Sequence, residues 1–262
     1  MSAPLTQVGT RRAREPTFYG RDFYEMQSAG SARSASIVVP IVLQMLSVQS
    51  VCDVGCGVGT WLNTFANHGI RDFLGLDGDY VEPEMLQIPR DKFQATNLEK
   101  SFRIGRTFDL AVSLEVAEHL SPARAESFVE DLTRLSSIIL FSAAVPNQGG
   151  VNHINERWPS YWARIFFTHG FGVCDVVRSK IWDNGGITPC YRQNLLIFAR
   201  SEIISSNPLL IESRPEQVDV AHPIFYSRLI PDSDVRLLAK HLWWAINRNL
   251  RRRLKTPRRE GG

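Results

Sequence analysis

Two carboxylates and an imidazole occur within five residues of one another, at Glu115, Glu118 and His119. They follow an apolar run, and one helical turn would place side chains i, i+3 and i+4 on the same side. His153, in a later stretch rich in Gly, Asn and Pro, could add a fourth polar group. Such a set could hold a divalent cation, or an imidazole could accept a proton from a substrate hydroxyl. The residue types leave both roles open, beside a purely structural one.

A glycine-rich turn lies further towards the N-terminus, within residues 51–62 (VCDVGCGVGTWL). Its first residues favour a buried strand, and Asp53 lies inside that strand. Gly55, Gly57 and Gly59 allow a sharp turn and a close backbone approach to a ligand. The apolar spacing after Gly59 is helical. A strand, a glycine turn and a helix N-terminus in this order suit an adenosine-type cofactor.

Two further strands are predicted after this turn. Residues 73–77 form the first, which ends in Asp77 about 20 residues beyond the glycine turn, where a carboxylate can accept both ribose hydroxyls. Residues 93–98 form the second together with the loop that follows it. The amide oxygen of Asn97 in that loop can accept a hydrogen bond from an adenine amino group.

These motifs, followed by a buried strand at 108–115, resemble the class I S-adenosylmethionine-dependent methyltransferases in order and spacing over roughly residues 50 to 200. The family usually has Asp where this chain has Asn97. The resemblance implies S-adenosylmethionine as cofactor, bound by Asp53, Gly55, Cys56, Gly57, Gly59, Asp77, Gly78, Asn97, Leu98, Ser113 and Glu115. It also implies the strand order 3-2-1-4-5-7-6, with strand 7 antiparallel.

Alternating strands and helices predict an α/β protein with a Rossmann-like, seven-stranded, mostly parallel sheet and helices on both faces. We expect helices at about 35–46 and 122–135, and a third that residues 156–162 lead into and that reaches 169, with further strands at 137–142, 171–177 and 194–199. In related methyltransferases the segment before the first strand lies over the cofactor cleft as a helical lid. Packing of this helix on the sheet edge is an equally good interpretation.

The E-x-x-E-H sequence with a later histidine resembles the catechol O-methyltransferases of ubiquinone biosynthesis and the small-RNA terminal 2′-O-methyltransferases. That resemblance implies a divalent ion (Mg²⁺, Mn²⁺ or Zn²⁺) held by Glu115, Glu118, His119 and His153, which lowers the pKa of an acceptor hydroxyl. Metal-free class I enzymes also carry this sequence, and His119 or His153 would then act as the base. We predict O-methylation of a small-molecule or glycan hydroxyl, with Glu115, His119 and His153 as the catalytic residues. Residues 151–162 and the turn at Trp182 are expected to form an acceptor pocket with aromatic walls.

Composition limits the partners. The 262-residue chain has a net charge of only +3, so nucleic acid is not the expected partner, although both ends are basic. Its four cysteines form no C-x-x-C pair, which indicates a reducing, cytoplasmic location. The longest apolar run, residues 37–46, is too short to span a bilayer, and residues 1–10 lack the apolar core of a signal peptide.

The chain divides by composition into four parts. We expect a flexible N-terminus at 1–16, a methyltransferase domain with its lid at 17–200, a connector at 201–232, and a basic amphipathic helix with a tail at 233–262. That helix suits docking on the domain or on a second subunit, or a peripheral contact with anionic lipid. Two other functions stay open: methylation of an RNA 2′-hydroxyl, and a non-catalytic scaffold that binds S-adenosylmethionine. The sequence does not fix the oligomeric state.

Overall fold

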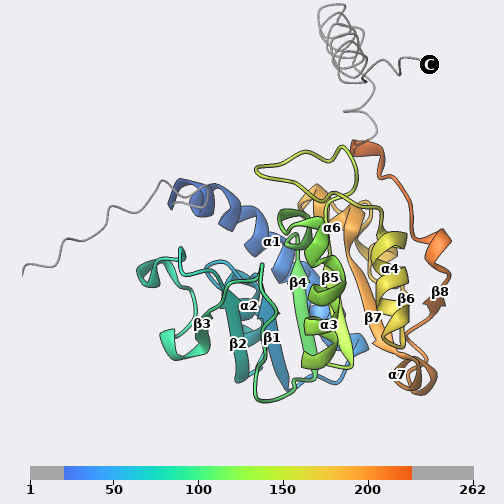
Figure 1. Cartoon of the computed structure of the whole chain (residues 1–262), viewed down its shortest axis with the longest axis horizontal. Coiled ribbons are helices and arrows are strands. Elements are labelled where there is room, and N and C mark those ends of the chain that lie inside the picture. Colours follow the sequence, from blue (N-terminus) through green and yellow to red (C-terminus); the bar gives the residue numbers. More distant parts are fainter. Residues whose placement is uncertain (1–20, 226–262) are drawn as a thin grey trace, which may run out of the picture. The chain divides into compact units, whose positions relative to one another are not determined.

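The structure is a computed structural model that describes residues 21–225 (Figure 1). The chain divides into two compact units, Met1–Val220 and Ala221–Gly262, and only residues 221–225 of the second are described. The N-terminus at 1–16 and the basic helix at 233–262 lie outside the described residues, so both stay predictions. Within residues 21–225, no helix combines the length and apolar character needed to cross a membrane.

A single mixed sheet organises the first unit, with the strand order β3-β2-β1-β4-β5-β7-β6-β8 (Figure 1). Its strands are β1 (Ser50–Val54), β2 (Asp72–Asp77), β3 (Phe93–Ala95), β4 (Leu110–Leu114), β5 (Ile138–Ser142), β6 (Phe171–Cys174), β7 (Leu196–Arg200) and β8 (Glu212–Ser213). Neighbouring strands from β3 to β5 pair in parallel, and β7 pairs antiparallel with both β5 and β6. The predicted Rossmann-like fold and its strand order are therefore confirmed.

One strand was not predicted. β8 pairs antiparallel with the edge of β6, through Val173 with Ser213 and Cys174 with Glu212. It lies inside the segment 201–232 that the sequence suggested as a connector, and the helix α7 (Ser201–Ser206) precedes it. Two residues are too few to show an alternating pattern, and only pairing with β6 defines this strand. The sheet thus continues past residue 200.

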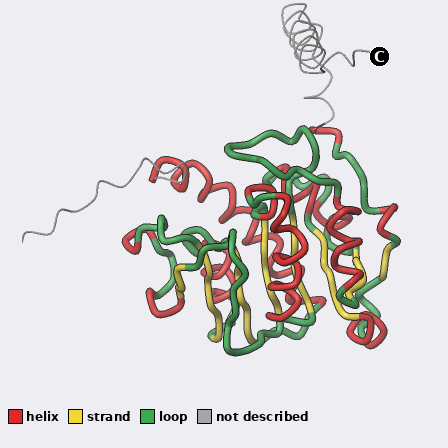
Figure 2. The backbone as a smooth tube through the Cα atoms, in the orientation of Figure 1, coloured by secondary structure: helices red, strands yellow, loops and turns green. Residues whose placement is uncertain are grey.

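Helices cover both faces of the sheet (Figure 2). On one face α1 (Arg21–Met45) and α2 (Thr60–Asn67) contribute Val38, Val42 and Phe65 to an apolar core. On the other face α3 (Ala125–Leu135) and α4 (Pro159–Thr168) contribute Phe128 and Phe166. Since both faces are covered, the central strands carry almost unbroken apolar residues, as parallel strands do.

Three helix predictions need correction. α1 begins at Arg21, well before residue 35, and continues through Pro40. The predicted helix 122–135 is a 3₁₀ turn (Pro122–Arg124) followed by α3. Between β6 and β7 lie two short helices, α5 (Arg178–Ile181) and α6 (Pro189–Asn194), where only a turn was expected. Helices of four and six residues carry too little periodicity to be recognised in a sequence.

Candidate functional site

The glycine turn connects β1 to α2 in the geometry that its sequence predicts. Gly55, Gly57 and Gly59 have φ values of 84°, 54° and 84°, which L-residues with a side chain rarely adopt. Space is also restricted, because a Cβ atom on Gly55 would lie 2.3 Å from the Val116 side chain. The turn therefore needs glycine both for its backbone angles and for its contact with the residues after β4.

Asp77, at the end of β2, binds the glycine turn through its carboxylate. Gly57 N donates to Oδ2 at 2.6 Å, while Gly78 N donates to Oδ1 at 2.7 Å and the Tyr80 hydroxyl donates to the same oxygen. Burial raises the pKa of Asp77, and these hydrogen bonds oppose that shift. Tyr80 lies directly over Gly78, where a Cβ atom would be 2.0 Å from its ring.

Asp53 lies behind the turn and is almost fully buried. Burial, and then the charge of Asp77, raise the pKa of Asp53 to about 8. Burial also raises the pKa of the Cys56 thiol well above its ordinary value. Both side chains are therefore largely uncharged at neutral pH, and Cys56 packs against β2, where a Cβ atom on Gly75 would lie 2.7 Å from its sulfur.

These elements surround a cavity of about 640 Å³, a size that suits a small-molecule cofactor. Nine of the eleven predicted cofactor residues line it: Asp53, Gly55, Cys56, Gly57, Asp77, Gly78, Asn97, Leu98 and Glu115. Gly59 and Ser113 do not. Gly59 precedes the first residue of α2, and Ser113 is fully buried inside β4. Both residues belong to the elements around the cavity and do not line it.

Several lining residues were not found from the sequence. Ser31 of α1, Trp61 of α2 and Tyr191 of α6 lie together at the cavity. The Ser31 and Tyr191 hydroxyl oxygens are 3.0 Å apart, and the Trp61 and Tyr191 rings meet edge to face with centroids 5.1 Å apart. Tyr191 is more than 100 residues from the glycine turn, so no local pattern signals it. α1 thus borders the cavity through Ser31, while its later residues pack in the apolar core on the sheet.

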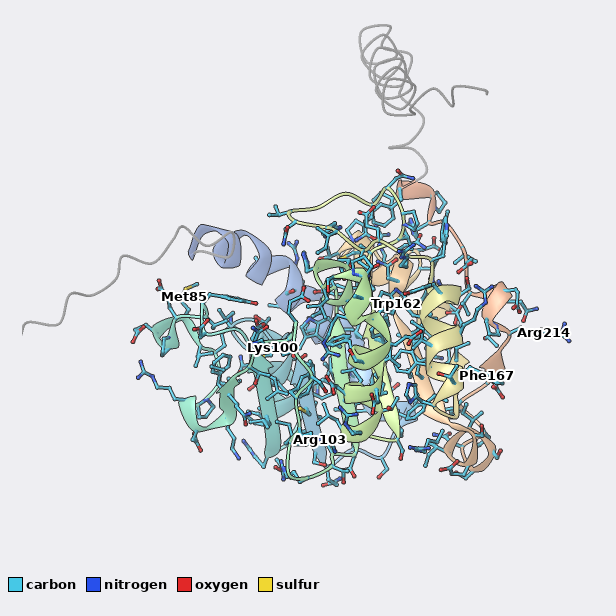
Figure 3. The ribbon with its side chains drawn as sticks, viewed as in Figure 1. Met85, Lys100, Arg103, Trp162, Phe167 and Arg214 are labelled. Carbon is cyan, nitrogen blue, oxygen red and sulfur yellow. The ribbon has the colours of Figure 1, made fainter. Side chains whose placement is uncertain are left out.

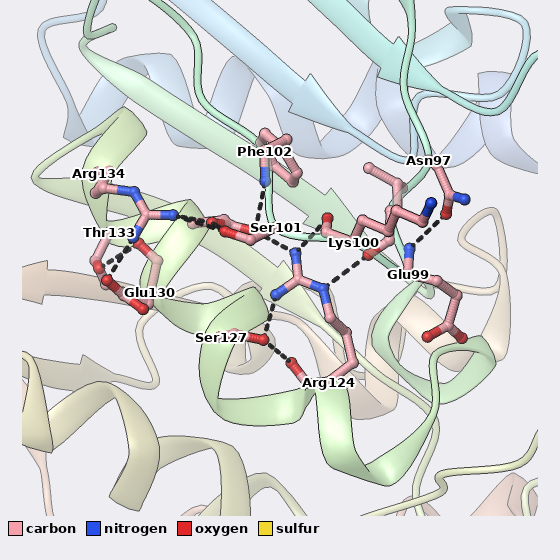
Figure 4. Close-up of polar contacts among 12 residues, drawn as sticks. Asn97, Glu99, Lys100, Ser101, Phe102, Arg124, Ser127, Glu130, Thr133 and Arg134 are labelled. Carbon is pink, nitrogen blue, oxygen red and sulfur yellow. Dashed lines mark hydrogen bonds and ion pairs between the residues drawn. The ribbon is translucent and has the colours of Figure 1, made fainter.

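The loop that carries Asn97 and Leu98 is attached to α3 by a buried arginine (Figure 4). Arg124 Nε donates to the Leu98 carbonyl at 2.9 Å and Nη2 donates to the Lys100 carbonyl at 3.1 Å. The same guanidinium forms an ion pair with buried Asp131. Asn97 Oδ1 accepts from Glu99 N at 3.0 Å and keeps a second lone pair for a ligand.

Glu115, at the end of β4, is held by two amide side chains from distant segments. Gln148 Nε2 donates to its Oε2 at 2.8 Å, and Asn194 Nδ2 donates to its Oε1 at 3.1 Å. Asn194 Nδ2 also lies 2.8 Å from Gln148 Oε1, which closes the network. Glu115 has a φ of 55°, an unusual angle for a residue other than glycine. Neither amide was a predicted site residue.

Three of the four predicted metal ligands come together. Glu118, His119 and His153 each offer a ligand atom, and these atoms lie within 4.8 Å of one another. Ala117–His119 forms a 3₁₀ turn rather than the expected α-helical turn. Glu115 is not in this group, because its oxygens accept hydrogen bonds from the two amides described above.

Within the cluster of Glu118, His119 and His153, burial shifts the pKa values of Glu118 and His119. Glu118 is fully buried, and burial followed by the charge of Glu115 raises its pKa well above the ordinary value. Neither Glu118 carboxylate oxygen makes a hydrogen bond of standard geometry within residues 21–225. Burial, and then the charge of His153, lower the pKa of His119 to about 4. The two imidazole rings meet edge to face, with centroids 4.8 Å apart.

The predicted aromatic acceptor pocket is only partly present. Of residues 151–162 only Asn152 lines the cavity, and Trp182 does not line it. Trp162 points from α4 into the apolar core, where its ring lies 5.5 Å from that of Phe141 (Figure 3). Trp158 is 41% exposed. His119 lines the cavity, whereas Glu118 and His153 do not. The cluster of these three residues therefore adjoins the cofactor cavity through His119.

The strand order and the glycine-turn cavity define a class I S-adenosylmethionine-dependent methyltransferase. Residues 22–169 match the methyltransferase-domain family, and the chain belongs to it. A search of curated protein sequences gave no match.

Solved structures share the fold at low sequence identity. The sugar N-methyltransferase KedS8 from Streptoalloteichus sp. has a TM-score of 0.52 at 15% identity, covering 75% of this chain and 99% of its own. CalS10, an amino pentose methyltransferase from Micromonospora echinaspora solved with S-adenosylmethionine, has a TM-score of 0.51 at 16% identity, covering 72% and 100%. DesVI from Streptomyces venezuelae has a TM-score of 0.50 at 16% identity, covering 68% and 95%.

Proposed function

We propose that this methyltransferase transfers its methyl group to a hydroxyl oxygen of a small molecule or glycan. The observation that carries the proposal is the cluster of Glu118, His119 and His153, which adjoins the cofactor cavity through His119. Methyl transfer from a sulfonium is an in-line displacement with a good leaving group. The protein must therefore mainly position the acceptor and remove its proton.

The cluster fits a divalent metal ion. Glu118 offers a buried carboxylate whose oxygens lack hydrogen bonds of standard geometry, and His119 and His153 offer imidazole nitrogens nearby. Carboxylate and imidazole together suit Mg²⁺, Mn²⁺ or Zn²⁺. When bound, such an ion would lower the pKa of the acceptor hydroxyl. Glu115 would support the site from beside Glu118.

In the absence of a metal ion, His119 can serve as the proton acceptor. Burial, and then the charge of His153, lower its pKa to about 4 and keep the imidazole neutral at physiological pH, which is the form that can accept a proton. That low pKa also makes His119 a weaker base than an unperturbed histidine. We therefore favour the metal-assisted reaction, in which His119 acts as a metal ligand and does not need to be a strong base.

The choice of oxygen as acceptor rests on the cluster and not on the fold. KedS8 acts on a sugar nitrogen, so the shared fold is compatible with N-methylation. Both acceptors release a proton, but a neutral amine can attack before losing it, whereas a hydroxyl needs the proton removed in order to attack, so the acid and two imidazoles have the larger role with an oxygen acceptor.

Isothermal titration of the chelator-treated protein with S-adenosylhomocysteine, and separately with Mg²⁺, Mn²⁺ and Zn²⁺, tests this proposal. We expect micromolar cofactor binding and a distinct metal isotherm that Glu118→Ala removes. Methyl transfer to catechol and sugar diols, measured beside a short RNA, then identifies the acceptor class. Cofactor binding without any metal signal would contradict the metal-assisted form, and transfer to RNA alone would contradict the small-molecule acceptor.

A further inference from the structure

Glu156 makes a contact with the cluster that neither the sequence motif nor the proposed reaction requires. It lies in the loop between β5 and α4, and its Oε1 is 3.0 Å from Nδ1 of His153. The same carboxylate accepts hydrogen bonds from Asn147 N at 2.8 Å and from Gly149 N at 2.9 Å. An ionised carboxylate can only accept, so Nδ1 of a neutral His153 must carry the proton in this contact.

The loop backbone folds around this carboxylate. Asn147 and Gly149, which donate to it, have φ values of 70° and 72°. Gly150 provides the space for the imidazole, since a Cβ atom there would lie 2.2 Å from Nε2 of His153. His153 is thus fixed on one edge by Glu156 and packs against the main chain at Gly150.

We propose that Glu156 is a positioning residue that holds His153 in the tautomer with its proton on Nδ1. Nε2, the ring nitrogen that Glu156 does not contact, then keeps its lone pair, and we assign it as the nitrogen that His153 offers to Glu118 and His119. Without the carboxylate, a neutral imidazole can carry its proton on either nitrogen, and Nε2 loses its lone pair in part of the molecules. A carboxylate that fixes a ligating histidine in this way commonly strengthens a metal site. The inference rests on the proposed function only for the use of that lone pair.

The loop has other anchors, so Glu156 is not needed merely to fold it. Ile154 N and Asn155 N both donate to the main-chain carbonyl of Glu118, at 2.9 and 3.0 Å. Arg157 N donates to the Ala144 carbonyl at 3.1 Å. Loss of the Glu156 side chain should therefore release the His153 ring more than it displaces the loop.

The tautomer of His153 tests the proposal without metal, cofactor or turnover. Side-chain ¹⁵N NMR of the histidine-labelled full chain, with His153 assigned through His153→Gln, should show the proton on Nδ1. Glu156→Ala should shift the population towards the proton on Nε2. Asp219→Ala is the matched control, because Asp219 accepts from Ser160 N at 2.8 Å and from Ser160 Oγ at 2.6 Å at the start of α4. An unchanged tautomer in Glu156→Ala, or the same change in Asp219→Ala, would overturn the proposal.

Metal titration separates this inference from the proposed function. Glu156→Ala should weaken Mn²⁺ binding by about tenfold to a hundredfold. The double variant with His153→Ala should bind no more weakly than His153→Ala alone, because Glu156 acts through that ring. A further loss in the double variant would contradict the positioning role. Absence of metal binding in the wild-type protein would contradict the metal-assisted function, while the tautomer measurement would still decide the role of Glu156.

Discussion

The two halves of the site are built in different ways. The cofactor half, residues 50–98, consists of a glycine turn whose shape is fixed by backbone angles and of one carboxylate, Asp77, that accepts from Gly57 N in the turn and from Gly78 N. The acceptor half consists of residues 115–119, the loop 143–156 and α6, and it depends on side chains from segments far apart in the chain. The glycine turn is thus fixed by local main chain, whereas the acceptor half, and the Tyr191 wall of the cofactor cavity, depend on long-range contacts.

The two halves also differ in the hydrogen-bond donors that surround their buried carboxylates. Burial raises the pKa of Asp77 in one half and of Glu118 in the other. Asp77 receives two main-chain N–H groups and a phenol hydroxyl, which partly stabilise its charge. Glu118 receives no hydrogen bond of standard geometry within the described residues. Main-chain groups of Glu118 and Ala144 lower the pKa of Glu118 less than burial and the charge of Glu115 raise it, so a proton or a cation would stabilise this carboxylate and the acceptor half suits a metal ion.

The largest effect should come from the acceptor half. His119→Ala should lower the rate of methyl transfer by about a hundredfold to ten-thousandfold, since proton removal loses its acceptor or its metal ligand. The affinity for S-adenosylhomocysteine, measured by titration, should stay nearly unchanged. His68→Ala, at an exposed position after α2, is the control. Loss of both rate and affinity in His119→Ala would show that the two halves are not separable.

Asp77→Ala should give the reverse pattern. Removal of a carboxylate that accepts charge-assisted hydrogen bonds costs about 1.5–3 kcal/mol. We therefore expect cofactor binding about 10 to 150 times weaker by titration, because 1.4 kcal/mol corresponds to a tenfold change. Metal affinity should not change. Asp72→Ala, at the other end of β2 and paired with Arg106 on the surface, should leave both affinities intact. A parallel loss of metal binding would break the distinction between the halves.

The pH dependence of stability should reveal Asp53. Its pKa of about 8 in the folded protein exceeds the unfolded value of 3.8, so the folded state keeps a proton that the unfolded state releases. This contribution to stability is complete below pH 3.8 and is lost as the pH rises towards 8. Asp53→Asn should therefore gain stability over the wild-type protein between pH 5 and pH 8, by at least about 1.4 kcal/mol if one pKa unit is realised. Urea unfolding at both pH values measures it, and an equal difference at the two would disprove the shift.

The smallest effect is expected at Tyr80. Its hydroxyl donates to Asp77, the carboxylate that is predicted to receive the ribose hydroxyls, so cofactor binding must compete with this contact. Tyr80→Phe removes a hydrogen bond worth about 1 kcal/mol and should tighten S-adenosylhomocysteine binding by a few-fold. Tyr161→Phe, on α4, provides the control. Weaker binding in Tyr80→Phe would mean that the phenol contacts the cofactor directly.

Prediction from the sequence succeeded where the signal was local. The glycine turn, Asp77 and the strands of the sheet were all recognised, because each depends on residues close together in the chain. The short helix α6 was missed, and with it the contacts of Tyr191 and Asn194 at the site. Gln148 and Glu156 lie in a loop whose composition shows no pattern, so their contacts with Glu115 and His153 could not be foreseen.

The sequence by itself determined the class of fold and the glycine turn, since alternation of strands and helices and backbone angles at glycine are local properties. Tertiary structure decided which side chains meet beside it. Glu115 was a predicted metal ligand, but amides contributed from Gln148 and Asn194 hold its oxygens. Glu118 is left with His119 and His153. Hydrogen-bond partners and burial depend on the packing of distant segments, and for this reason only the folded chain separates these two carboxylates.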